Sequence, residues 1–448
     1  MLTVLRPSLC SPVGLITLRT CKLLAICCTV VMLGTAGVGA DIQYWLDDVP
    51  DYLWYYGCSP TAGGNLIGYW DNQPGYENLY AGTAPMTAPH SDPIYDIITS
   101  PEHITEPYTP NECAHTNAPN SLSCFMHTDP SNGGSYSWNI ATGLRRFAAW
   151  DDPNTEVNES YDFTSFVYYA PQAHWADIFN EAAFTFNDLV REIDSGRPLL
   201  LNMSLVGGGH SVAAYGYWID DDGDRWFATR DTWRDGDSTG YMGVDARLSS
   251  GQEWWRYTHQ QVVGSAGDEY FVSSAVPFIP NDSGPIVEET DFGNDPASAL
   301  TIYASAETIY ASAETIYASL TEGDEDWYRI WLDTGDRAVF TTQSDRGFKE
   351  AIDTQIRLYD EGGTWLAVSN NTSSLHTNVS NLFWRAQDSG WHYARIMGGE
   401  NFGMPQTGEY ALTYYYVQYP EPGTILLVSV GLVGIVLRRR GRRRADDA

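Results

Sequence analysis

In this 448-residue chain, Cys58 is the residue whose type and position most clearly suit it to a chemical reaction. Cys58 opens a predicted helix, because Gly57 permits a sharp turn before it, Pro60 suits a first helical turn, and apolar residues follow over 66–70. A thiol at a helix N-terminus lies at the positive end of the macrodipole, which favours the thiolate that attacks carbonyl carbon. Cys58 is therefore a candidate nucleophile, and a buried structural cysteine is the alternative.

A candidate base and a candidate orienting group follow Cys58 in chain order. His210 heads the apolar segment 212–219, which predicts a buried strand, and Asp231 follows 225–229, which we expect to return antiparallel. Asp231 would accept a hydrogen bond from one ring nitrogen of His210, and the other nitrogen would take the proton of Cys58. The three residues predict a Cys-His-Asp hydrolase. Surface positions near turns are the alternative for His210 and Asp231.

The residues between nucleophile and base predict the elements that hold them. Apolar side chains at i, i+3, i+4 and i+7 from Phe186 indicate an amphipathic helix that ends at 195–198. Residues 199–203 predict a buried strand that leads to His210. Helices early and strands late indicate an α+β catalytic unit.

The cysteines divide into two groups. Of the seven, four lie within residues 1–40, which leaves Cys58, Cys113 and Cys124 in the rest of the chain. Cys113 and Cys124 are close in sequence, and an exported protein would normally oxidise such a pair to a disulfide. Cys58 would then be the reduced thiol.

The N-terminus predicts export. Basic residues precede an apolar run over 23–38, and the small residues at 38–40 fit a cleavage site before Asp41. We therefore expect residues 1–40 to be a signal peptide. A start at a later codon and an uncleaved anchor are the alternatives.

Stretches over 48–52, 57–61 and 68–70 resemble the start of C39-like, papain-fold cysteine peptidase domains. The resemblance extends to a Gly-His segment on a later strand and an Asp on the next, positions that His210 and Asp231 match. It implies a catalytic domain over 41–280, a peptide or protein substrate, and no cofactor.

One position departs from the papain-like pattern. Such domains carry a Gln about six residues before the nucleophile to donate to the oxyanion, whereas this chain has Tyr52, and Gln43 lies farther upstream. Losing one oxyanion donor commonly costs about a hundredfold or more in rate. Two alternatives to a peptidase therefore stay open: an inactive papain-fold protein with a binding or structural role on the surface, and a transpeptidase or amide transferase that uses the same triad.

A second unit is expected over 321–418, after a linker at 281–320 that contains a repeated heptad. Short strand-like runs separated by Gly and Asp turns indicate an all-β, jelly-roll-like sandwich. The runs are at 327–332, 338–342 and 354–359. With the stretches 323–328, 358–360 and 389–396, this unit resembles the bacterial pre-peptidase C-terminal domain, a non-catalytic module.

The C-terminal residues 419–448 resemble a PEP-CTERM sorting signal. The motif Pro420, Glu421, Pro422 precedes an apolar run over 425–437 and six arginines within 438–444. The resemblance implies an exosortase-type sorting enzyme as partner, anchoring of the tail by a short transmembrane helix during transit, and a final location at the cell surface or outside the cell. An ordinary tail anchor is the alternative.

Composition limits the remaining functions. The formal net charge is −32, which argues against nucleic-acid binding because that function needs a basic surface. The acidic turn with Asp220, Asp222 and Asp224 is a candidate calcium site, although it lacks the distal Glu of an EF-hand loop. A solvated hairpin tip is the other interpretation of that turn.

Overall fold

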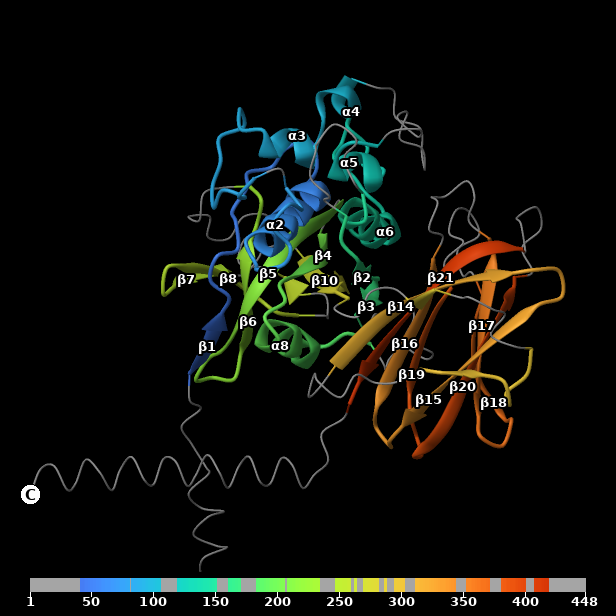
Figure 1. Cartoon of the computed structure of the whole chain (residues 1–448). Helices are drawn as coiled ribbons and strands as arrows, with labels where there is room; N and C mark the ends of the chain where they lie inside the picture. Colours follow the sequence, from blue (N-terminus) through green and yellow to red (C-terminus); the bar gives the residue numbers. More distant parts are fainter. Residues whose placement is uncertain are drawn as a thin grey trace, which may run out of the picture.

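The computed structural model describes most of the chain between residues 41 and 418 (Figure 1). The described residues are 41–80, 82–105, 119–150, 160–170, 183–205, 208–233, 246–258, 262–263, 269–281, 286–287, 294–302, 311–343, 352–370, 380–399 and 407–418. The predicted signal peptide and sorting tail lie outside them. Two units follow each other along the chain, the first with helices and a large sheet and the second built from strands.

The helices of the first unit come before most of its strands. They are α2 (Cys58–Asp71), α3 (Ile94–Ile98), α4 (Pro101–Thr105), α5 (Leu122–Phe125), α6 (Ser137–Ala148) and α8 (Phe186–Asp194). The predicted helix from Phe186 is confirmed as α8, which begins with a capping box between Thr185 and Asp188 and ends before Gly196 at a φ of 74°.

Helix α2 is buried on all sides and does not have the single apolar face expected from its sequence. Every residue from Ser59 to Asp71 is buried. Glycines make this possible, since a Cβ at Gly63 would lie 2.8 Å from Met126 Cε and one at Gly64 would lie 2.8 Å from Ile98 Cγ1. A helix enclosed in this way holds its first residue, Cys58, at a fixed place.

A nine-stranded sheet supports the helices. Its central strands β4 (Leu199–Leu205), β5 (Gly208–Ile219) and β6 (Arg225–Arg230) run antiparallel in chain order, which confirms the predicted strand at 199–203 and the predicted hairpin. The other strands are β1 (Ile42–Trp45), β3 (Tyr168–Tyr169), β7 (Ala246–Ser249), β8 (Gln252–Arg256), β9 (Val262–Val263) and β10 (Glu269–Val276). A separate pair joins β2 (Phe163–Ser165) to β11 (Phe278–Pro280).

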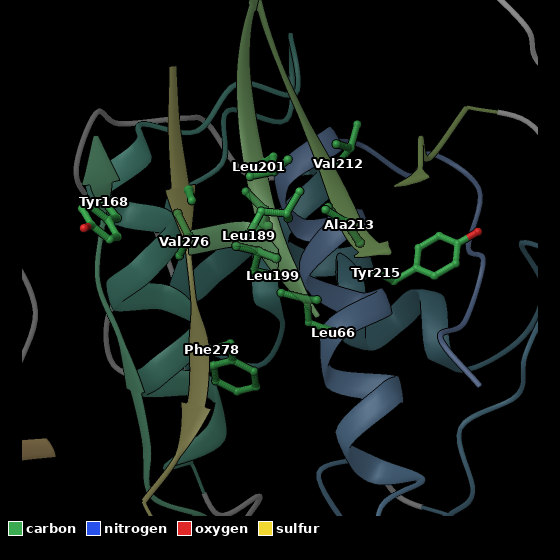
Figure 2. Packing of buried hydrophobic residues seen from close by; sticks show 14 of the residues in the cluster. Leu66, Tyr168, Leu189, Leu199, Leu201, Val212, Ala213, Tyr215, Val276 and Phe278 are labelled. Carbon is green, nitrogen blue, oxygen red and sulfur yellow. The ribbon is translucent and has the colours of Figure 1, made fainter. Parts of the chain in front are cut away.

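The core of the first unit lies between this sheet and its helices. Figure 2 shows Leu66 of α2, Leu201 of β4 and Val212 of β5 packed in one cluster. Successive β5 residues from Val212 to Tyr215 are all fully buried, so both faces of the strand are covered. Strand β5 is therefore a rigid support for His210 near its beginning.

The second unit is a sandwich of two five-stranded sheets around its own core. The first sheet has β12 (Ile286–Val287), β14 (Ala311–Leu320), β21 (Gly408–Val417), β16 (Arg337–Gln343) and β19 (Asn381–Arg385). The second has β13 (Leu300–Thr301), β15 (Glu325–Leu332), β20 (Gly390–Gly398), β17 (Thr354–Asp360) and β18 (Trp365–Asn370).

The expected linker at 281–320 contributes strands to the sandwich. Strand β14 pairs with β21 along its whole length, from Ala311 opposite Val417 to Leu320 opposite Gly408. The Thr-Ile-Tyr unit of the repeat explains this, because β-branched and aromatic side chains favour strand. The sandwich therefore begins before residue 321.

The first sheet of the sandwich faces the first unit (Figure 1). Tyr415 of β21 and Phe383 of β19 belong to the core cluster of the first unit, and the Tyr415 hydroxyl donates to Glu192 of α8 at 2.8 Å. Buried Arg337 of β16 forms an ion pair with Asp188 of α8. Apolar and ionic contacts thus join the two units.

Candidate active site

Cys58 is the first residue of α2 and is half-buried. The preceding Gly57 has extended backbone, so its role is steric, since a Cβ there would lie 2.8 Å from Pro60 Cγ and 2.9 Å from Thr128 Cγ2. The Sγ of Cys58 lies 4.0 Å from the Oγ of Ser59. Only a residue without a side chain lets the chain enter the helix with the thiol at its N-terminus.

His210 lies on β5 with 2% of its surface exposed. Its Nε2 is 2.9 Å from the backbone carbonyl oxygen of Asp231. A carbonyl oxygen only accepts, so Nε2 carries the proton and Nδ1 keeps its lone pair. Nδ1 is buried without a hydrogen-bond partner among the residues that the structure describes. The neutral ring therefore presents a basic nitrogen that is available to take a proton.

The segment after β6 orients this imidazole. Asp231 Oδ1 accepts from the backbone N–H of Trp233 at 2.8 Å, a local turn of the kind that Asp side chains form. Thr232 between them has a φ of 68°, a rare conformation for a β-branched residue. The Trp233 ring stacks on His210 with centroids 3.6 Å apart and planes at 19°. The strained backbone at Thr232 helps to hold Trp233 against the His210 ring.

Asp231 meets His210 in a different way from the one expected. The predicted hydrogen bond to a ring nitrogen is present, but the acceptor is the main-chain carbonyl and not the carboxylate. The carboxylate is instead used in the turn to Trp233. A sequence pattern shows which residue follows a strand and does not show which of its oxygens faces a neighbour.

Burial controls the protonation of the base. Desolvation lowers the pKa of His210 from 6.5 to about 4, and the hydrogen bond to the Asp231 carbonyl offsets only part of this effect. His210 is therefore neutral near pH 7, as a general base must be before it acts.

Cys58 and His210 line one cleft of about 440 Å³. Most of its lining residues are small or polar, and Trp54, Trp233 and Phe271 are the large aromatic ones. The remaining lining residues are Ser59, Asn132, Gly133, Gly134, Ser135, Ser137, Asn202, Met203, Ser204, Gly208, Gly209, Ser211 and Ser273. A thiol at a helix N-terminus and a neutral imidazole in one cleft suit nucleophilic attack on a carbonyl group.

Comparison with known proteins agrees with this geometry. Residues 41–263 match the Peptidase_C39 like family. The C39-like region thus contains every helix described above and strands β4, β5 and β6, of which β5 carries His210. Residues 420–440 match the PEP-CTERM protein-sorting motif, which implies export and recognition by an exosortase-type sorting enzyme. No curated protein matches the chain.

Two solved structures are among those similar to the chain. The pre-peptidase C-terminal domain of a collagenase from Bacillus anthracis is 20% identical, over 27% of this chain and 99% of that domain, with a TM-score of 0.20. The periplasmic g-type lysozyme inhibitor PliG from Aeromonas hydrophila is 6% identical, over 30% of this chain and 98% of that protein, with a TM-score of 0.20.

Tyr52, at the position expected for an oxyanion donor, does not line the cleft of the C39-like region. Its side chain is fully buried and its hydroxyl donates to the Pro85 carbonyl at 2.8 Å, while its backbone N–H donates to Asn65 at 3.0 Å. Tyr52 therefore fixes the chain ahead of α2. The backbone N–H groups at the start of α2 are a candidate oxyanion donor on the Cys58 side of the cleft.

Sequence reasoning missed the polar residues next to the candidate pair. Ser59 Oγ lies 2.8 Å from Ser211 Oγ, so the residue after the nucleophile contacts the residue after the base. The available signal was that a serine directly follows both Cys58 and His210.

The predicted disulfide lies partly outside the described residues, because Cys113 is not among them. Cys124, in α5, is buried, and its Sγ lies 3.4 Å from Nδ1 of His103. The pairing of Cys113 with Cys124 stays a prediction.

The acidic turn after β5 is held by its own carboxylates. Asp220 accepts from the Trp226 indole at 3.1 Å and pairs with Arg247, and Asp224 pairs with Arg256 at 2.7 Å. Within the described ranges, no three His, Cys, Asp or Glu side chains converge as a metal site requires. Calcium binding at Asp220, Asp222 and Asp224 stays a prediction.

Membrane association was expected only from the two chain ends. Over the described ranges, no helix has both the length and the apolar composition needed to cross a bilayer. The apolar run at 425–437 lies outside those ranges.

Proposed function

We propose that this exported protein is a cysteine peptidase that cleaves peptide bonds at Cys58. The observation that carries the proposal is that Cys58, at the N-terminus of a buried helix, shares a cleft with His210, whose Nδ1 keeps a lone pair. The match of this region to a peptidase family supports the same chemistry.

The reaction follows from the atoms in the cleft. The thiol proton passes to Nδ1 of His210, and Sγ attacks the carbonyl carbon of the scissile bond. The oxyanion develops beside the N-terminal backbone of α2, where the helix dipole favours negative charge. His210 then gives its proton to the leaving amine, and water releases the acyl group with His210 again as base. Asp231 holds the ring through its carbonyl throughout.

The first step requires closer approach of the two groups. No hydrogen bond joins Sγ of Cys58 to His210 among the described residues. Catalytic hydrogen bonds are often long in a free enzyme and shorten when substrate binds. This separation also supports the second candidate, a papain-fold surface protein that binds peptides without cleaving them.

A thiol-directed acyl-trapping probe tests the proposal. We expect labelling of Cys58, identified by peptide mass spectrometry, and we expect the labelling rate to fall about a hundredfold in His210→Ala because the general base is lost. Cys124→Ser is the matched control and should label like the wild type.

Two outcomes would overturn the proposed peptidase activity. One is the absence of acyl labelling at Cys58 in a folded protein, and the other is equal labelling in His210→Ala and the wild type. If labelling occurs and the acyl group moves to an added amine faster than to water, the site is a transferase.

A further inference from the structure

Four buried side chains form a continuous hydrogen-bond chain beside the candidate nucleophile. Ser59 contacts Ser211 at 2.8 Å, Ser211 donates to Asn202 Oδ1 at 2.7 Å, and Asn202 Nδ2 donates to Ser274 Oγ at 3.0 Å. Each of the four is at most 9% exposed. The chain crosses from α2 to β5, β4 and β10, and its free end is the Ser59 oxygen, 4.0 Å from Sγ.

The side-chain types determine which group donates and which accepts at each of these hydrogen bonds. The Asn202 carbonyl oxygen can only accept, so the single hydroxyl proton of Ser211 points to it. Ser59 must then donate to Ser211. Ser59 therefore presents a lone pair to Sγ, which suits a thiol that donates a proton and opposes a thiolate.

The same heavy-atom positions allow the opposite order. Rotation of the Asn202 amide by half a turn exchanges its oxygen and nitrogen, so that Asn202 donates to Ser211 and accepts from Ser274. Ser211 then donates to Ser59, and Ser59 donates to Sγ. Each hydroxyl keeps its own proton and only rotates, so no proton is gained or lost by the chain.

We propose that this hydrogen-bond chain reverses when Cys58 ionises, so that Ser59 donates a hydrogen bond to the thiolate. Ser59 contacts the reacting atom, while Ser211 and Asn202 act through it as positioning residues. A role of this reversal in catalysis rests on the proposed function. The effect of Ser59 on the Cys58 thiol rests on the contacts alone. The proton released by Cys58 goes to Nδ1 of His210, which lines the same cleft.

The pH dependence of Cys58 alkylation tests the proposal. A hydrogen bond to a charged group contributes about 1.5–3 kcal/mol, so Ser59→Ala should slow iodoacetamide labelling of Cys58 about tenfold or more near neutral pH and leave the limiting rate at high pH unchanged. The readout is the labelled Cys58 peptide, measured by mass spectrometry in the full-length protein.

Ser211→Ala should not slow labelling. Without Ser211, the Ser59 hydroxyl has no competing acceptor and can donate to the thiolate, so labelling near neutral pH should equal or exceed that of the wild type. The Ser59→Ala, Ser211→Ala double variant should behave like Ser59→Ala. Loss of packing alone would not produce this difference between two serines that contact each other.

Buried Ser165, which donates to the Pro277 carbonyl at 2.9 Å, provides the matched control. Ser165→Ala should keep the wild-type profile. Circular dichroism checks folding of each variant, and Ser59→Gly replaces Ser59→Ala if the latter does not fold. The proposal is overturned if Ser59→Ala keeps the wild-type profile, or if Ser211→Ala slows labelling as much as Ser59→Ala.

This test separates the two proposals. If alkylation shifts as described and the acyl probe fails to label Cys58, the proposed reversal of the hydrogen bonds is supported and the proposed peptidase activity is not. If the acyl probe labels Cys58 and the alkylation profiles do not change, only the proposed reversal is wrong.

Discussion

At the scale of single residues, the candidate base combines burial with an available nitrogen. His210 is covered by the Trp233 ring and donates from Nε2 to a main-chain carbonyl, so its neutral form is favoured. Protonation of this ring is unfavourable in the folded protein, because the charged imidazole would be buried. His210 should therefore reduce the stability of the fold in acid.

The contribution of His210 to the free energy of unfolding should decrease as pH falls from about 6.5 to about 4, the ordinary and the lowered pKa of this residue. Between these values His210 binds more protons in the unfolded chain than in the folded one, and its shift corresponds to about 3 kcal/mol of lost stability. Burial raises the pKa of Asp71 to about 6, which acts in the opposite direction over the same window. The His210 contribution is therefore measured by urea unfolding at both ends of the window as the difference between the wild type and His210→Gln, which should lose less stability on acidification. The exposed His90 offers a control, because His90→Gln should keep the full effect.

At the scale of elements, the entry into α2 decides where the thiol lies. A Cβ at position 57 would meet Pro60 and Thr128 at less than ordinary contact distance. We expect Gly57→Ala to destabilise the protein by about 1–3 kcal/mol, because crowding in a packed region forces neighbours to move. The displaced helix start should also slow acyl labelling of Cys58.

Gly390 is the matched control for this prediction, because a Cβ there meets nothing within 4 Å. Urea unfolding of Gly390→Ala should differ little from the wild type. Equal stability of Gly57→Ala and Gly390→Ala would show that the start of α2 adapts, contrary to the steric argument.

The elements of the first unit could be predicted from sequence where periodicity was strong. Helix α8 and strands β4 to β6 follow directly from apolar spacing, and Cys58 and His210 were identified as candidates because a helix start and a strand start are local signals. The contact of Ser59 with Ser211 could not be predicted, because it joins residues 152 positions apart through the packing of α2 on β5. The complete burial of α2 likewise depends on neighbours that its own sequence does not reveal.

At the scale of the whole molecule, a buried ion pair joins the sandwich to the first unit. Arg337 of β16 bonds to Asp188 of α8 and to the Ala183 carbonyl. Without Arg337, the buried Asp188 keeps Arg191 as an ionic partner and Thr185 as a hydrogen-bond donor, so Arg337→Ala should cost about 1–3 kcal/mol in urea unfolding.

A surface pair provides the comparison for Arg337. Arg256 and Asp224 form an ion pair with side chains 41% and 38% exposed. Arg256→Ala should cost less than about 1 kcal/mol, because solvent screens exposed charges. If both variants lose the same small amount, the pair between the units contributes nothing to their attachment.

Processing of the chain ends is the second prediction at this scale. Strand β1 begins at Ile42 and β21 ends at Val417, so the described fold stays complete if the mature protein starts near Asp41 and ends near Pro420. We expect mass spectrometry of protein from the native host to find these ends. Intact peptides spanning 425–444 as the main species would instead indicate a permanent tail anchor.

The position of β21 determines how the sandwich responds to mechanical load from its C-terminal side. The strand is central in its sheet, hydrogen-bonded to β14 on one side and to β16 on the other, and its Tyr415 and Val417 reach the core cluster of the first unit. Tension applied along residue 418 acts on two antiparallel ladders in shear, so many hydrogen bonds carry the force together. A chain held by its tail during sorting is therefore pulled at a strand that resists extraction.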